Sequence, residues 1–357
     1  MSSLRILKIV ETSEDIQKMI YENKSPNSPF CPAIMVALGD ENDDASNAII
    51  FQKLGPYFKD LKDNRIVLDG IKIKCLLFHQ MDGKSKSKVT GHSGSSSDYN
   101  CQICFATKKG FDREDMKKTS NICHNIVTNT RWNFKKKASL YNEAKGCEKY
   151  AFFDIEPSEL VPDCLHIILN MQSWYEDAVI KNMAYTHIDD QEACEDLFLT
   201  TVKDTRLSEA ETRYKQMVKS EMKFSRSVAE KRQNPGRYCK TWFEQSVLDK
   251  IFSLINDSVP KKDLLENIQT FCKMKRIFLK KEKTHEDAVL YCNLKDEWIR
   301  QKKEKLNYLS DTNTTHNLVV HIPHFLKNSA LPLSLLDFST EGWYLKYPNI
   351  QFLHLNF

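Results

Sequence analysis

The chain has 357 residues, of which 41% are hydrophobic, 28% charged and 10% aromatic. This apolar content excludes a wholly disordered chain and allows one large domain or two to three ordinary ones. The net charge of +4 neither demands nor excludes nucleic acid, so the distribution of the 52 Lys and Arg residues matters more. No apolar run approaches the roughly 20 residues that cross a bilayer, and the N-terminus lacks the pattern of a signal peptide. We therefore expect an intracellular, soluble protein.

The first elements in chain order are strands and one helix. The short apolar run Pro32–Leu38 is typical of a buried strand. Two β-rich runs between Arg65 and Phe78 flank Asp69-Gly70, the strongest short-range signal for a hairpin. Residues 84–98, rich in Ser, Gly and Lys, predict a mobile loop. The helix expected before the hairpin carries apolar side chains at Ala48, Ile49, Phe51, Leu54, Phe58 and Leu61.

From about residue 150 the pattern changes, because strand-like runs nearly vanish and long amphipathic stretches rich in Lys and Glu take their place. Helices are predicted at 165–185, 205–233, 241–256, 262–282 and 286–306. The segment from residue 311 mixes His, Pro and aromatic residues and fits no single class. The sequence therefore predicts a small α/β unit followed by a helical domain.

Two pairs of residues have the spacing of metal ligands. The chain holds eleven cysteines, an odd number at mostly irregular spacing, which fits buried free thiols better than a disulfide framework. Only Cys101 and Cys104 form a Cys-x-x-Cys pair, and His316 and His321 form a second pair far downstream. Two such pairs can close one tetrahedral zinc site and so fasten the end of the helical region to the α/β unit. The alternatives are a chance Cys-x-x-Cys with surface histidines, and His324 in place of His321.

Acidic and basic clusters each allow two interpretations. Carboxylates at the end of the Pro32–Leu38 strand could hold Mg²⁺, although local spacing favours an N-cap for the next helix; these residues are Asp40, Glu41, Asp43 and Asp44. Asp82 is a further strand-end carboxylate. The basic stretch Arg213–Lys240, with Trp132, Tyr238 and Trp242 available for stacking, favours nucleic acid over ordinary solvated helix faces, because the excess is local in a nearly neutral chain.

The order of these features resembles the catalytic core of the V(D)J recombination-activating recombinase and the related Transib-type DNA transposases. In that family, Pro-Asn-Ser precedes an apolar strand that ends in Leu-Ala-Asp-Glu-Ser-Asp, and residues 22–43 are similar to that segment. The separation of Asp82 from Cys101 matches the family's distance from a strand-end Asp to its Cys-x-x-Cys. Leu165-His166 and the run His316-x₄-His321-Ile-Pro resemble two further family motifs. The similarity covers about residues 5–345 at low identity.

The resemblance implies an α+β fold, a partial RNase H-like mixed sheet with a large, mostly helical insertion stapled by zinc at Cys101, Cys104, His316 and His321. Residues 1–110 would form a partial RNase H-like domain without its first strand. Residues 111–310 would form the helical insertion and zinc-binding region. Residues 311–357 would be a return segment with the zinc histidines and a degraded C-terminal catalytic helix.

The chemistry implied by the resemblance is DNA strand cleavage and transfer, in which carboxylates hold two Mg²⁺ or Mn²⁺ ions about 4 Å apart. Asp82 would be the family's second catalytic Asp and Glu41 an auxiliary carboxylate. Aligned by its distance from His321, Glu341 would be the family's last catalytic Glu. Aligned by the local motif Ser-Thr-Glu-Gly, Tyr344 would occupy that position instead. The family's first catalytic Asp precedes the point where this chain begins. We therefore expect a truncated or inactive derivative that binds DNA without cleaving it.

The partners implied by the resemblance are double-stranded DNA and a second copy of the chain, in the nucleus. Neither a membrane nor a small-molecule substrate is expected. The DNA-binding residues would be Lys219, Lys223, Arg226, Arg232 and Arg237. Two other hypotheses stay open at this point: a fragment of an active DNA recombinase or endonuclease, and a zinc-clipped helical interaction protein with no role in nucleic-acid binding.

Overall fold

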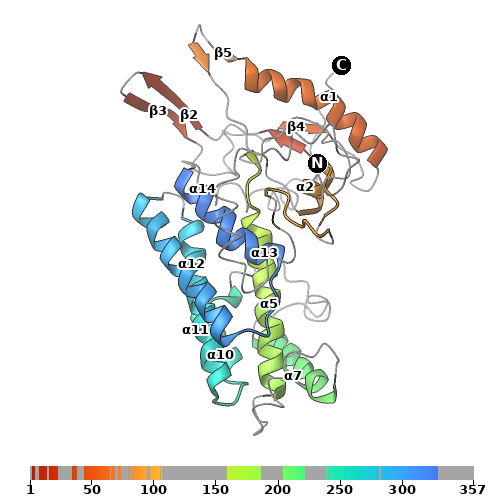
Figure 1. Cartoon of the computed structure of the whole chain (residues 1–357), viewed down its shortest axis with the longest axis vertical. Coiled ribbons are helices and arrows are strands. Elements are labelled where there is room, and N and C mark those ends of the chain that lie inside the picture. Colours follow the sequence, from red (N-terminus) through yellow and green to blue (C-terminus); the bar gives the residue numbers. More distant parts are fainter. Residues whose placement is uncertain are drawn as a thin grey trace. The chain divides into compact units, whose positions relative to one another are not determined.

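The structure, a computed structural model, describes short segments between residues 2 and 106 and, beyond them, residues 159–185, 204–221, 239, 241–280 and 283–328. This part of the chain is mostly helical (Figure 1). The chain divides into two compact units, one formed by residues 1–105, 126–163 and 331–357, the other by residues 106–125 and 164–330. None of the described helices is long and apolar enough to cross a bilayer.

The strands of the first unit form antiparallel pairs. The pairs are β1 (Ser2–Leu4) with β4 (Ile34–Ala37), β2 (Lys8–Ser13) with β3 (Ile16–Glu22), and β5 (Ile66–Leu68) with β6 (Ile71–Ile73). Strand β4 confirms the strand predicted in the apolar run. Leu68 pairs with Ile71, which confirms the predicted hairpin. Among the described residues no sheet has more than two strands, so the RNase H-like sheet stays a prediction.

The first long helix follows β4. Helix α1 (Asp44–Asp63) confirms the helix predicted from the spacing of its apolar residues. It begins at Asp44, the last residue of the acidic cluster, which is the position expected if that cluster caps a helix. Asp40, Glu41 and Asp43 lie outside the described residues.

The predicted mobile loop at 84–98 is wrong at its beginning, because helix α2 (Gly83–Val89) occupies it. Composition was misleading here, since the lysine and serine side chains are used inside the fold. The buried Lys86 ammonium donates to the Val161 carbonyl at 2.6 Å. The buried Ser87 hydroxyl accepts from the Gln102 amide at 2.9 Å. Such bonds satisfy polar groups that would otherwise favour solvent.

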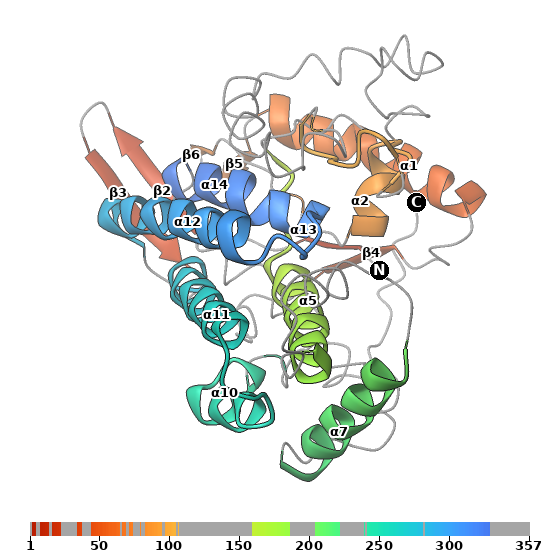
Figure 2. The ribbon, with the colours of Figure 1, turned by 60° about the horizontal axis from the view of Figure 1, so that its bottom comes forward.

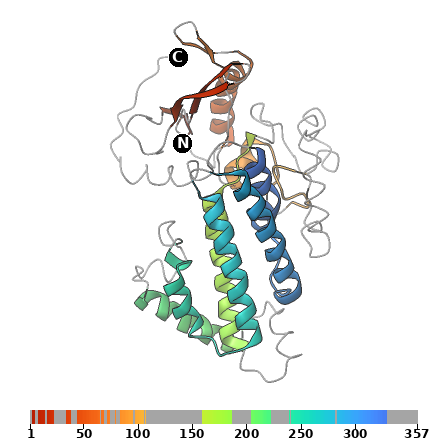
Figure 3. The same cartoon turned by 90° about the vertical axis from the view of Figure 1, so that its left-hand side faces the viewer.

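The second unit is built mainly from helices. They confirm the predicted helical stretches where the structure describes them, and residues 222–233 and 281–282 of those stretches lie outside the described residues. They are α5 (Cys164–Tyr185), α7 (Thr205–Glu221), α10 (Gln245–Phe252), α11 (Val259–Phe278) and α12 (His285–Lys305). Helix α11 packs against both α12 and α5 (Figure 3). Helix α7 packs on α5 (Figure 2).

Aromatic side chains that carry a polar atom fill the centre of this unit. The Trp298 indole N–H donates to the Tyr175 hydroxyl at 2.9 Å, and that hydroxyl lies 2.8 Å from Oδ1 of Asn267. All three side chains are fully buried. A second chain of buried hydrogen bonds runs from Trp242 to Tyr214 and on to Glu176. These networks join α5, α7, α11 and α12 through hydrogen bonds of 2.8–2.9 Å, an ordinary length for a good bond.

The start of α12 is fixed by a reciprocal cap. The Thr284 hydroxyl accepts from the backbone N–H of Asp287, and the Asp287 carboxylate accepts from the backbone N–H of Thr284. The ammonium of Lys280 donates to the same carboxylate at 2.6 Å. This hydrogen bond, with the bond from Thr284, holds the pKa of Asp287 below its ordinary value.

We expect Asp287→Asn to lower the free energy of unfolding by about 1 kcal/mol at pH 7, the usual worth of a helix cap. Because the pKa is depressed in the folded state, the carboxylate stabilises the fold above the unfolded-state pKa of about 3.9, and this stabilisation is lost as pH falls further. Urea unfolding at pH 7 and pH 3.5 measures both values. Asp296→Asn, at a more exposed site on the same helix, is the control. An equal loss at both pH values would contradict this account.

Candidate metal centre

The segment from residue 311 fits no class by sequence, and its residues 313–328 form a continuous helical run. It consists of α13 (Asn313–His316), the π-helical turn η4 (Asn317–His321) and α14 (Ile322–Asn328). Its start is fixed by a capping box between Thr312 and Thr315. Just before the cap, Asp311 forms a buried ion pair with Lys302 of α12. The run is therefore held firmly at the end that carries His316.

The π-helical turn decides how the two histidines lie. In an α-helix, residues five apart point about 140° away from each other around the axis, since each residue advances about 100°. A π-helical turn holds more residues, so residues five apart return to nearly the same side. The turn is marked by the backbone N–H of Ile322, which donates to the carbonyl of Asn317 five residues earlier.

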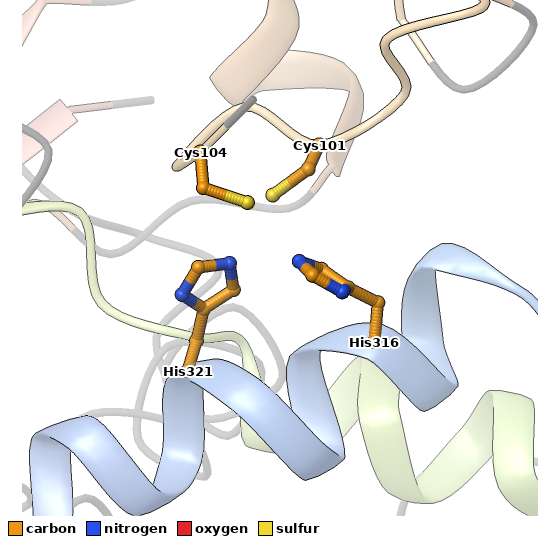
Figure 4. A group of neighbouring side chains, drawn as sticks. All are labelled: Cys101, Cys104, His316 and His321. Atoms are coloured by element: carbon orange, nitrogen blue, oxygen red, sulfur yellow. The ribbon is translucent and has the colours of Figure 1, made fainter. Parts of the chain in front are cut away.

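The resulting geometry places the two imidazoles side by side, as two ligands of one metal ion would lie. His316 and His321 are both buried, and their ring centroids lie 4.9 Å apart at an interplanar angle of 80°. Figure 4 shows both imidazoles projecting from one side of the ribbon toward the two cysteines. A spacing of five residues would not achieve this on a regular α-helix.

The cysteine pair lies on a tight turn at residues 101–104. Cys101 and Cys104 are 0% and 3% exposed. The backbone N–H of Ile103 donates to the Cys101 sulfur at 3.3 Å. This hydrogen bond helps to fix the orientation of the Cys101 side chain.

The ligand atoms of Cys101, Cys104, His316 and His321 all lie within 4.8 Å of one another, and all four residues are buried. Ligand atoms of a tetrahedral zinc site lie about 3.6 Å apart, given metal–ligand bonds of about 2.0–2.3 Å. Small side-chain rotations therefore suffice to close the site. Two thiols and two imidazoles suit zinc and not Mg²⁺, which prefers oxygen ligands. This cluster could bind a metal such as zinc.

The prediction that these four residues come together is confirmed, and His324 is not part of the cluster. Outside the cluster, Cys164 and Cys239 are buried and form no disulfide, as expected for most of the cysteines. Sequence reasoning missed the π-helical turn. The signal that could have revealed it is Pro323, two residues after the second histidine, because proline disturbs a helix at the residues that precede it.

The residues proposed for catalysis and most of those proposed for DNA binding are not described by the structure. Lys219 lies in α7, without a description of its side chain. The others lie outside the described residues: Glu41, Asp82, Lys223, Arg226, Arg232, Arg237, Glu341 and Tyr344. Their roles stay predictions.

The structure describes residues at and near both ends of the basic stretch. Trp242 was expected to be available for base stacking, and this is wrong, because it is fully buried and its indole donates to the Tyr214 hydroxyl at 2.8 Å. Lys215 forms an ion pair with Glu211 at 3.0 Å, one turn earlier on the helix. The beginning of the stretch therefore contributes less free positive charge than its sequence suggests.

The chain matches no protein-family model and no curated protein sequence. The case for a metal centre therefore rests on the geometry and chemistry of its four residues.

Proposed function

We propose that this chain is a DNA-binding member of the V(D)J recombinase and Transib transposase family, a zinc-stapled derivative of a two-metal nuclease. One observation carries the proposal. The sequence contains eleven cysteines and ten histidines. The resemblance selects two of each, and those four are the residues whose ligand atoms meet within 4.8 Å. Sequence spacing alone left open whether the cysteine pair and the histidine pair share one site. Their proximity in the fold therefore supports the proposal independently of the sequence resemblance.

The bound metal would have a structural role. All four tetrahedral positions would be taken by Cys101, Cys104, His316 and His321, which leaves no open position for water or substrate. Zinc would neutralise the two thiolates and cross-link two segments that are far apart in the sequence. The protein's own contribution would be to bring four buried ligands together in the folded chain, so that metal binding and folding are coupled.

DNA binding is proposed through the part of the basic stretch that follows the Lys215–Glu211 pair. Positive side chains that neutralise phosphates release counterions from DNA, so affinity falls with salt by a slope of about 0.9 per phosphate contact. The side chains proposed for this role are Lys219, Lys223, Arg226, Arg232 and Arg237. They would position the chain on the phosphate backbone without reading sequence.

We expect the triple variant Lys219→Glu, Lys223→Glu, Arg226→Glu to weaken duplex-DNA binding and to reduce the salt slope by about 3. Fluorescence anisotropy with a labelled duplex at several salt concentrations measures both quantities.

The matched control reverses three exposed lysines outside the stretch, Lys53, Lys250 and Lys262. It makes the same change in net charge, so it separates a local site from general attraction. The proposal would be contradicted if the wild-type chain did not bind duplex DNA, or if both triple variants lost DNA affinity equally. Either result would favour the zinc-clipped interaction protein.

A further inference from the structure

The carbonyl of Leu318, inside the π-helical turn, is denied both of its helical donors. In an α-helix its donor would be the backbone N–H of Ile322, but that group donates to Asn317. In a π-helix its donor would be residue 323, and Pro323 has no N–H. The same proline explains the turn itself, since its ring would clash with the carbonyl four residues earlier in a regular α-helix.

A side chain from another helix supplies the missing donor. The Tyr291 hydroxyl of α12 donates to the Leu318 carbonyl at 2.9 Å. Tyr291 is fully buried, and Phe278 packs against it edge to face. Burial raises the pKa of Tyr291 well above its usual value, so the hydroxyl keeps the proton that it donates. The ring is thus fixed, and the bond is protected from water.

We propose that Tyr291 is a positioning residue of the metal centre, which acts through its hydrogen bond to the Leu318 carbonyl. This bond satisfies the carbonyl that the π-helical turn leaves without a backbone partner, and so stabilises the turn. The π-helical turn then keeps His316 and His321 on one side of the helical run. Without the hydroxyl, the buried carbonyl is unsatisfied, and helical registers that separate the two imidazoles become competitive. The inference rests on the proposed metal centre.

The test is a Co²⁺ titration of the full-length metal-free protein, with zinc competition. Co²⁺ bound by two thiolates and two imidazoles in a tetrahedron gives intense visible absorption bands, which report ligand geometry directly. We expect Tyr291→Phe to weaken metal binding about 10- to 100-fold, as for other partners that orient metal ligands, and to alter these bands. Far-UV circular dichroism at the titration temperature checks that each variant is folded.

Tyr175→Phe is the matched control. Tyr175 is equally buried, and its hydroxyl bonds Trp298 and Asn267 within the same helical unit, whereas the Tyr291 hydroxyl bonds the π-helical turn. Its removal is expected to lower the melting temperature while the metal affinity and the absorption bands stay as in the wild type. The control therefore separates a general loss of stability from a loss of ligand geometry.

Two results would overturn the role of Tyr291: a Tyr291→Phe protein with wild-type affinity and bands, or equal weakening in both variants. Failure of the wild-type chain to bind Co²⁺ or zinc would instead refute the metal centre itself. DNA binding by the wild-type chain is measured separately, so failure of the proposed function is distinguished from failure of this inference.

Discussion

Removal of the bound metal by EDTA is expected to lower the melting temperature of the protein by about 10 °C. At a free zinc concentration 1,000-fold above Kd, binding to the folded state alone contributes about 4 kcal/mol. One kcal/mol corresponds to about 2–4 °C in domains of ordinary size. The effect is large because the four ligands come from two segments far apart in the sequence, so only the folded chain brings them together to bind the metal.

Variants of the cysteines test whether this effect belongs to the proposed site. Cys104→Ala is expected to melt at a lower temperature than the wild type and to hold less than one zinc per chain. EDTA should not lower its melting temperature further. Cys239→Ala is the control, because Cys239 is as deeply buried but lies outside the cluster. It should keep one zinc and the full response to EDTA. Calorimetry and elemental analysis give both readouts, and a wild-type melting curve that EDTA leaves unchanged would contradict a structural metal.

Trp298→Ala is expected to lower the free energy of unfolding by about 3–5 kcal/mol, the usual loss for a large aromatic side chain in a core. Trp298 is fully buried, so its removal leaves a cavity between α12 and α5. It also takes away the indole N–H that donates to the Tyr175 hydroxyl. Trp298→Phe keeps most of the apolar contact and isolates the hydrogen bond, for which about 1–2 kcal/mol is expected.

The neighbouring Trp174 provides the comparison for this prediction. Its ring centroid lies 5.9 Å from that of Trp298, but Trp174 is partly exposed and its indole donates to the Ser310 carbonyl near the surface. Urea unfolding should show a clearly smaller loss for Trp174→Ala than for Trp298→Ala. If the two losses were equal, burial would not be the cause of the effect.

Elements encoded by neighbouring residues were determined by the sequence alone. The apolar spacing in α5, α11 and α12 predicted helices within a few residues of their ends. The Asp-Gly turn predicted the pairing of β5 with β6. Short spacing also predicted each pair of metal ligands by itself, but it left open whether the two pairs join, because they lie far apart in the sequence. What these cases share is that the deciding interactions lie within a few residues.

Other features were decided only by tertiary structure. A stretch rich in Ser and Lys became helix α2 because Lys86 bonds a carbonyl at Val161, far away in the chain. Trp242, which looked available for stacking on bases, is held inside the core by Tyr214. The choice of His321 over His324 depends on a π-helical turn that Pro323 prompts and that the Tyr291 hydroxyl of another helix completes. None of these partners leaves a local pattern, because a hydrogen bond between distant segments exists only once packing has brought its two ends together.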